Sequence, residues 1–177
     1  MGDTKNENET LDPGRKSYHT GIVWQIDHGV RFCEELFGEM HNDSSGLIWR
    51  NISEIGKSLG YPIELDLDKY ELLEQHGALR VYTARAKDGD LIGYGVYFLS
   101  PPLKAKGELH AYQDAIFIHP EWRKSWLGLQ FIRYCDQQLE SAGVHAIHQS
   151  VPHDKNFGPA LKRLGYQQTQ TTWIRRF

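Results

Sequence analysis

The chain has 177 residues, which is enough for one domain of ordinary size with a substantial hydrophobic core. Hydrophobic residues make up 40% of the chain and aromatic residues 12%, so the composition predicts a folded globule and excludes a disordered chain. The formal net charge is −3 and the 20 basic residues form no run, so the charge pattern gives no reason to expect nucleic-acid binding, although it does not exclude it.

Membrane, metal and disulfide classes are disfavoured as well. No stretch reaches the roughly 18 apolar residues needed to cross a bilayer, and the first ten residues are polar and acidic, unlike a signal peptide. A cytoplasmic protein is therefore expected. His145, His148 and His153 lack the spacing of a zinc site, so no metal is expected. Cys33 and Cys135 lie in apolar patterns typical of small buried hydrophobes.

The N-terminal part is predicted to contain a tail, a strand and a helix. Residues 1–17 lack periodicity and are expected to form a mobile tail, which leaves 18–177 as a single domain. Gly21–Ile26 is typical of a short strand. From Asp27 to Met40 the apolar residues recur at helical spacing, which predicts a helix with Asp27 as its N-cap.

Two further helices and a hairpin follow in the sequence. The apolar residues from Ile48 to Leu59 share one helix face, and a shorter helix is predicted from Asp66 to His76. Strands at Leu79–Ala86 and Leu91–Leu99 flank the turn Asp88-Gly89. Asp-Gly between two β-rich runs is the strongest short-range signal for a β-hairpin.

The segment from Tyr112 to Leu139 is the most informative part of the chain. A strand ending in Asp114–Ile118 is followed by a short basic loop and a long amphipathic helix. The start of a helix presents unpaired backbone N–H groups, and the helix dipole favours an anion there. Because Arg123 and Lys124 add positive charge, the pattern predicts a site for a phosphorylated cofactor.

The predicted order of elements indicates the fold class. After the long helix come a strand at Val144–Val151, a short helix after Asn156 and a terminal strand ending at Thr172–Arg175. The whole order is strand, helices, three antiparallel strands, helix, strand, helix and strand. It predicts an α+β (mixed α/β) fold, in which helices cover both faces of a mostly antiparallel sheet.

Two motifs carry a resemblance to a known family. Arg123-x-x-Trp126-x-Gly128 resembles the cofactor signature Gln/Arg-x-x-Gly-x-Gly/Ala of the GCN5-related N-acetyltransferase (GNAT) superfamily, with tryptophan in place of the first glycine. Downstream, Asn156–Tyr166 is similar to the family's fourth helix, which closes in Leu-Gly-Tyr/Phe. The resemblance covers Leu79–Phe177. The core also looks like acetyltransferase-like proteins encoded by bacteriophage genomes, and a phage-encoded protein would be located in the cytoplasm of the bacterial host.

The resemblance implies a twisted sheet in which two neighbouring strands splay apart around acetyl-CoA, the acyl donor. A free N–H of Phe117 or Ile118 would polarise the thioester carbonyl, and the backbone of Lys124–Gly128 would hold the diphosphate. Asn156 would contact the pantetheine arm, cap its helix, or both. The implied cofactor-binding residues are Ile116, Phe117, Ile118, Arg123, Lys124, Ser125, Trp126, Leu127, Gly128 and Asn156.

Trp126 departs from the family signature and limits the backbone. Glycine tolerates either sign of φ, whereas tryptophan fits only where φ is negative. Its ring would then point outward, over the cofactor or a substrate, or would cap the start of the helix against the core. Both alternatives remain open on sequence alone.

A base is expected near the thioester, because an attacking amine must be neutral. Strict alternation along the strand places Tyr112, Asp114, Ile116 and Ile118 on one face. Asp114 is the first candidate, since burial within a strand raises the pKa of a carboxyl group. Alternatively, it pairs with the backbone or an arginine. His110 is the second candidate, or a surface-loop histidine, and Glu108 lies nearby.

The family often supplies a tyrosine as general acid at the position that is Leu161 here. Tyr166, Tyr112 or water would take that role, or the chain is a poor catalyst. The sequence therefore predicts an acetyl-CoA-dependent N-acetyltransferase that acts on a primary amine of a small molecule or protein, by direct attack in a ternary complex. The alternatives are an inactive acyl-CoA-binding or protein-interaction module on the same fold, or transfer of another acyl group. The oligomeric state, including a homodimer, stays open.

Overall fold

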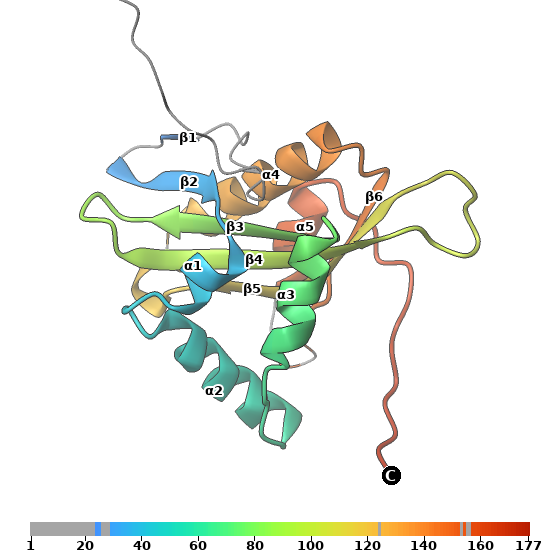
Figure 1. Cartoon of the computed structure of the whole chain (residues 1–177), viewed down its shortest axis with the longest axis horizontal. Helices are drawn as coiled ribbons and strands as arrows, with labels where there is room; N and C mark the ends of the chain where they lie inside the picture. The colour runs from blue at the N-terminus through green and yellow to red at the C-terminus, as the bar shows by residue number, and fades with distance from the viewer. Residues whose placement is uncertain (1–23, 26–28, 124, 153, 155–156) are drawn as a thin grey trace, which may run out of the picture.

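A six-stranded sheet runs through the molecule (Figure 1). The computed structural model describes residues 24–25, 29–123, 125–152, 154 and 157–177, so the predicted tail at 1–17 lies outside the described residues. The strands lie side by side in chain order, antiparallel except for the parallel pair β5–β6. They are β1 Trp24–Gln25, β2 Arg31–Glu34, β3 Leu79–Arg85, β4 Leu91–Ser100, β5 His110–Ile118 and β6 Ala146–His148.

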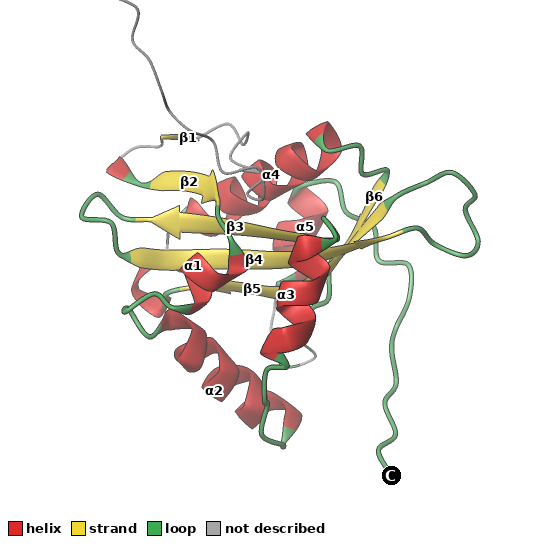
Figure 2. Ribbon diagram, viewed as in Figure 1, coloured by secondary structure: helices red, strands yellow, loops and turns green. Residues whose placement is uncertain are grey.

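Helices cover both faces of this sheet, as Figure 2 shows, and the predicted α+β fold class is confirmed. One face carries α1, α2 and α3, and the other carries α4 and α5. Their bounds are α1 Phe37–His41, α2 Leu47–Leu59, α3 Leu67–Gln75, α4 Leu127–Ser141 and α5 Gly158–Arg163, with a short 3-10 turn, η2, at Pro120–Trp122. Among the described residues, none of the helices is long and apolar enough to cross a membrane.

Each face of the sheet has its own hydrophobic core. Under α4 the core contains Phe32, Tyr97, Phe131 and other side chains that are fully buried. Under α1 and α2 it contains Phe37, Leu47 and their neighbours. The stripe of apolar residues on α4 accounts for its position, because one helix face must be buried against the sheet.

A nearly buried arginine fixes the β3–β4 hairpin to the first part of the chain. Arg85 donates through Nε and Nη2 to the two carboxylate oxygens of Glu35, at 2.6 and 2.7 Å. Its Nη1 donates to Asp43 and to the carbonyl oxygen of Gly89. Such bidentate pairs fix direction as well as distance. The connection between β2 and α2 is thereby held against the hairpin turn.

The predicted helix from Asp27 to Met40 is wrong. Asp27 lies outside the described residues. Within 29–40, Gly29 has φ +76°, β2 occupies Arg31–Glu34, and the α-helix begins only at Phe37. Phe32 packs in the core under α4, whereas Phe37 and Met40 pack in the core under α1 and α2. Apolar residues that recur at helical spacing in the sequence therefore pack on opposite faces of the sheet. Periodicity alone does not separate that arrangement from one helix.

Two predictions about the C-terminal part also need correction. The strand predicted at Val144–Val151 is only Ala146–His148, and the terminal strand ending at Thr172–Arg175 does not form. The segment after α5 leaves the body as a loop (Figure 2), with Trp173 91% exposed. β-Branched and aromatic residues favour a strand only where a neighbouring strand pairs with them.

A bulge in β5 breaks the alternation that the sequence predicts. Val96 pairs with Ala115 but Tyr97 pairs with Gln113, so Asp114 is an extra residue on β5. Ile116 and Ile118 pack in the core on the α4 side, while Asp114 lines a pocket on the α1–α3 side. The prediction that all three share one face is therefore wrong.

A partly buried carboxyl group, that of Asp136, joins α4 to the segment after α5. The hydroxyl of Tyr166 donates to Asp136 Oδ1 at 2.5 Å, and Gln149 Nε2 donates to the same hydroxyl at 3.3 Å. Burial raises the pKa of Asp136 from 3.8 to about 6, against the opposing effect of the Tyr166 hydrogen bond. Because Tyr166 is engaged in this contact, its hydroxyl serves to hold the chain together.

We expect Asp136→Asn to change the pH dependence of stability. The folded-state pKa is raised, so the contribution of Asp136 to stability is complete below about 3.8 and is lost as the pH rises through about 6. Asparagine keeps an acceptor for Tyr166 and cannot ionise. The difference in free energy of unfolding, variant minus wild type, should therefore increase by on the order of 1–2 kcal/mol between about pH 4 and about pH 7.

Urea unfolding at several pH values measures this difference. Asp90→Asn, which alters an exposed carboxylate in the β3–β4 turn, serves as the control and should show little change over the same range. A constant difference between Asp136→Asn and the wild type would contradict the assignment.

Candidate active site

Strands β5 and β6 separate soon after they meet. They pair only at His110–Tyr112 with Ala146–His148, although β5 continues along β4 to Ile118. Beyond the last pair, Gln113 Oε1 accepts a hydrogen bond from the N–H of Ser150 at 3.0 Å, so a side chain spans the start of the gap. Beyond this point, the edge of β5 opposite β4 is no longer paired with β6, and a gap opens between the two strands.

The hydrogen-bond pattern tells which backbone groups face this gap. The N–H of His119 donates to the carbonyl oxygen of Ile92 on β4. Because alternate residues of an antiparallel strand point to the same neighbour, the N–H of Phe117 also faces β4, and that of Ile118 faces the gap. Of the two N–H groups that the sequence suggested for polarising a carbonyl, the geometry favours Ile118.

The start of α4 presents a second set of backbone N–H groups. The N–H of Leu127 is taken by Ser125 Oγ at 3.2 Å, and the N–H of Gln130 by the carbonyl oxygen of Trp126 at 3.0 Å. The N–H groups of Gly128 and Leu129 lie between these two in the first helical turn, where the helix itself offers no acceptor. An anion is favoured at this place.

Gly128 has no role that the fold explains. Its φ is not in the left-handed region, and a Cβ added there would meet no atom within 4 Å. Glycine in a helix costs about 1 kcal/mol relative to alanine. A glycine in open space beside the N–H groups of the first helical turn leaves room for a phosphate to approach the backbone, so the described residues at the start of α4 fit the diphosphate of acetyl-CoA.

Arg123 makes several contacts within the protein. Its Nε donates to the carbonyl oxygen of Ile118 at 2.8 Å, and its Nη2 lies 3.0 Å from Glu54 Oε2 on α2. The guanidinium also lies over the ring of Phe117, 4.7 Å from its centre. These contacts direct Arg123 toward α2 and fasten the end of β5.

Trp126 is the N-cap of α4, with φ −71°. The residue is 68% exposed, so the alternative in which its ring caps the helix against the core is wrong and the outward orientation is confirmed. Because the residue lies outside the first helical turn, a glycine here carries little of the usual helical cost. Lys124 and Asn156, two of the expected cofactor ligands, lie outside the described residues.

Asp114 is exposed, in contrast to the burial that the sequence suggested. The hydroxyl of Tyr70 on α3 donates to its Oδ2 at 2.5 Å. The Tyr70 ring stacks on Phe37 at 4.4 Å between ring centres, which fixes the donor. Burial, followed by the Asp114 hydrogen bond, raises the pKa of Tyr70 well above its ordinary value, so the hydroxyl stays protonated as a donor.

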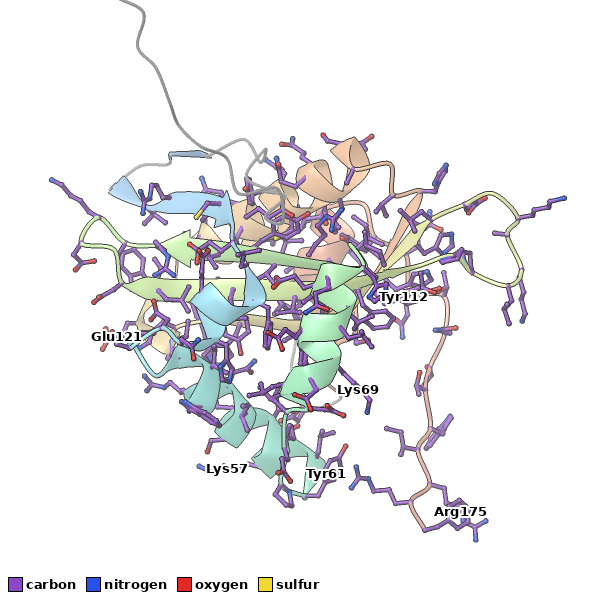
Figure 3. All side chains as sticks on the ribbon, viewed as in Figure 1. Lys57, Tyr61, Lys69, Tyr112, Glu121 and Arg175 are labelled. Carbon is purple, nitrogen blue, oxygen red and sulfur yellow. The ribbon has the colours of Figure 1, made fainter. Side chains whose placement is uncertain are left out.

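A pocket of about 320 Å³ lies beside Asp114 on the α1–α3 side of the sheet. Its walls come from the loop before α3, from α3, and from strands β3, β4 and β5. Lys69 on α3 and Tyr112 on the sheet are labelled in Figure 3. The lining residues are Ile63, Glu64, Leu65, Asp66, Lys69, Tyr70, Leu73, Leu79, Phe98 and Asp114.

The other two catalytic candidates lie on the same strand, farther from the gap. His110 Nε2 is 2.8 Å from Glu108 Oε2, and His110 Nδ1 is 3.0 Å from His148 Nε2. Tyr112 stacks between Phe98 and His148, at 5.1 and 4.4 Å between ring centres. His110 therefore lies within β5 and not in a surface loop. Burial, followed by the neighbouring His110, lowers the pKa of His148.

The position that the resemblance assigns to a general acid is buried. Leu161 on α5 is 7% exposed and packs inside the protein. Tyr166, the first substitute, donates to Asp136 instead. Within the part of the chain that the structure describes, no group of three or more His, Cys, Asp or Glu residues is arranged to hold a metal ion.

Residues 48–166 match the model of the acetyltransferase (GNAT) family. The chain belongs to the GNAT family. No curated protein matches its sequence.

Solved structures with the same fold include several acetyltransferases. The ribosomal-protein-alanine N-acetyltransferase from Brucella melitensis biovar Abortus 2308 has a TM-score of 0.63 at 19% identity, over 84% of this chain and 99% of the other. An aminoglycoside acetyltransferase from an uncultured soil metagenomic sample, solved with sisomicin, has a TM-score of 0.62 at 13% identity, over 86% and 97%. AAC(6')-Iy with a bisubstrate analogue of CoA has a TM-score of 0.57 at 17% identity, over 84% and 97%. At these identities the likeness shows the fold alone.

Sequence reasoning missed Tyr70 and Phe98. Tyr70 is one polar residue on a short helix, and its contact with Asp114 spans 44 positions of the chain. Phe98 reads as an ordinary strand residue, although it is 36% exposed in the pocket. No local sequence pattern predicts either role, because both the Tyr70–Asp114 contact and the position of Phe98 in the pocket arise from tertiary packing.

We expect Gly128→Leu to separate cofactor binding from stability. Leucine is a better helix former and would meet open space, so the free energy of unfolding should stay equal or rise by up to about 1 kcal/mol. Its side chain would cover the N–H groups at the start of α4 and lower CoA affinity at least about tenfold. Gly38→Leu on α1, where an added Cβ also meets nothing, should leave CoA affinity unchanged. Calorimetric titration with CoA measures both, and equal affinities in the two variants would contradict the site.

Trp126→Gly tests whether the tryptophan obstructs the site. Because the ring is exposed and the residue is a cap, stability should change by less than about 0.5 kcal/mol. We expect the wild type to bind CoA and the variant to bind at least as well. Absence of binding by the wild type together with binding by Trp126→Gly would show that the ring closes the site.

Proposed function

We propose that the protein is an acetyl-CoA-dependent N-acetyltransferase that acts by direct attack of an amine in a ternary complex. The observation that carries the proposal is the position of Asp114. It is the extra residue of the β5 bulge, close to the point where β5 leaves β6, and it lines the pocket on the α1–α3 side. A cofactor held in the gap and an amine held in the pocket would meet beside this carboxylate.

Backbone groups of the chain would hold the cofactor. The N–H groups of Gly128 and Leu129 would bind its diphosphate, and the N–H of Ile118 would polarise its carbonyl oxygen. Acetyl-CoA, when bound, supplies an acyl group activated as a thioester. Preorganised N–H donors aimed at an oxygen that gains negative charge are among the largest contributions to catalysis.

Asp114 would handle the proton of the attacking amine. Tyr70 holds one of its oxygens by a hydrogen bond, and among the described residues no other donor contacts the second oxygen. That oxygen is available to the ammonium form of the acceptor, and the exposed carboxylate can pass the proton to water. General bases of this kind contribute roughly 10²- to 10⁴-fold to the rate.

A catalytically weak acyl-CoA-binding module is the second candidate. The observation that favours it is Leu161, which is buried at the position where the resemblance expects a general acid. In an active enzyme, water or Tyr112 would have to protonate the leaving thiolate. A module and an enzyme bind the cofactor alike, so only acetyl transfer separates them.

We expect Asp114→Asn to retain CoA binding and to lose acetyl transfer by roughly 10²-fold or more at neutral pH, because the amide cannot accept the proton. Release of free thiol from acetyl-CoA, followed with an amine present, measures the rate. Asp90→Asn should transfer at the wild-type rate. A wild-type rate in a folded Asp114→Asn protein would exclude the role and direct attention to His110 and Glu108.

Tyr70→Phe provides a second test if Asp114→Asn does not fold. It removes the donor to Asp114 and leaves the ring stacked on Phe37. The rate should fall while CoA affinity stays unchanged. An unchanged rate would show that the orientation of Asp114 is irrelevant to transfer.

A further inference from the structure

The pocket beside Asp114 is largely apolar. Two of its residues, Leu73 and Phe98, are each 36% exposed, so their carbon atoms face space that a ligand can enter. Covering apolar surface is favourable by about 25 cal/mol per Å². The apolar lining residues are Ile63, Leu65, Leu73, Leu79 and Phe98.

The charges in this pocket leave an excess of carboxylate. Lys69 Nζ lies 2.6 Å from Asp66 Oδ2, and Asp66 also caps the start of α3, so this pair is neutralised within the protein. Glu64 and Asp114 remain as negative groups in the lining. The pocket therefore favours a ligand with one positive group near Asp114.

Size and polarity argue against acceptors that carry many amines. A volume of about 320 Å³ lies at the lower end of the range for small-molecule sites. A second ammonium group that lay against Leu79 and Phe98, away from Glu64, would lose its hydration without a partner. The aminoglycosides named with two related structures are polyamines, and this pocket suits a different acceptor.

We infer that the acceptor is a small monoamine with an apolar alkyl or aryl body, which rests on the proposed function. The amine lies against Asp114, and the body lies against Leu73, Leu79 and Phe98. Transfer forms a bond from the nitrogen to the acyl carbon and breaks the carbon–sulfur bond of acetyl-CoA. The bound ammonium ion first loses one proton through Asp114 to water, which gives the neutral amine that attacks. A second proton passes from the nitrogen, by way of water, to the departing thiolate, so the products are an amide and free CoA.

The test measures amine binding directly, on the full chain, with and without saturating CoA. 2-Phenylethylamine is the probe, and 2-phenylethanol has the same body without the amine. 1,4-Diaminobutane adds a second ammonium group, and sisomicin represents the aminoglycosides. We expect 2-phenylethylamine to bind at least about tenfold more tightly than each of the other three. Tighter binding of the diamine or of sisomicin would overturn the inference.

A matched pair of variants on α3 locates the binding. Leu73 lines the pocket, whereas its neighbour Leu72 is 54% exposed and does not line it. Leu73→Ser should weaken 2-phenylethylamine binding about tenfold, and Leu72→Ser should leave it unchanged. Equal effects of the two variants would overturn the placement.

Acetyl-CoA binding and thiol release on the same protein test the proposed function separately. Binding of 2-phenylethylamine without any acetyl transfer would overturn the activity and leave the ligand class standing. Acetyl transfer to polyamines alone would support the activity and overturn the ligand class.

Discussion

Strand β5 keeps its ladder with β4 as far as Ile118 but leaves β6 after Tyr112, so several backbone groups face no neighbouring strand. A buried polar group without a partner costs about 1–3 kcal/mol, so such a stretch persists only where water or a ligand reaches it. The chain secures the two ends of this gap. Gln113 spans its start, and Arg123 satisfies the carbonyl oxygen of Ile118 at its end. The gap is thus a fixed feature of the fold. The proposed roles of the pocket and of the start of α4 both depend on a cofactor that lies in this gap.

The bulge in β5 places a carboxylate, that of Asp114, close to this gap. Without the extra residue, strict alternation would place Asp114 on the same face as Ile116 and Ile118, whose side chains pack under α4. The bulge changes the face in one step, so the carboxylate lies in the pocket while the isoleucines remain in the core. Bulges often re-aim a side chain next to an active site. Here the bulge allows one strand to contribute both to the hydrophobic core and to the lining of the pocket.

The elements that the sequence predicts correctly are those with local causes. The hairpin follows from Asp88-Gly89, and α4 follows from its apolar stripe. The prediction fails where contacts with other elements decide the structure. Phe32 and Met40 are at helical spacing but pack on opposite faces of the sheet, and the predicted terminal strand pairs with no strand among the described residues. The motif predicts an anion site in the loop before α4, and this stays a prediction. The exposure of Asp114 was not, because a bulge has no signal in the residues around it.

The apolar walls and the carboxylate act in opposite directions on an amine. Desolvation by Leu79 and Phe98 favours the neutral amine, which is the nucleophile, whereas the negative charge of Asp114 favours the ammonium ion. Asp114 is exposed, so its attraction is screened by water, and Tyr70 already occupies one of its oxygens. The balance therefore suits a ligand that enters as an ammonium ion at the solvent side and gives up its proton as its body becomes buried. A wholly buried carboxylate would hold the cation too firmly, and a wholly apolar pocket would not attract it.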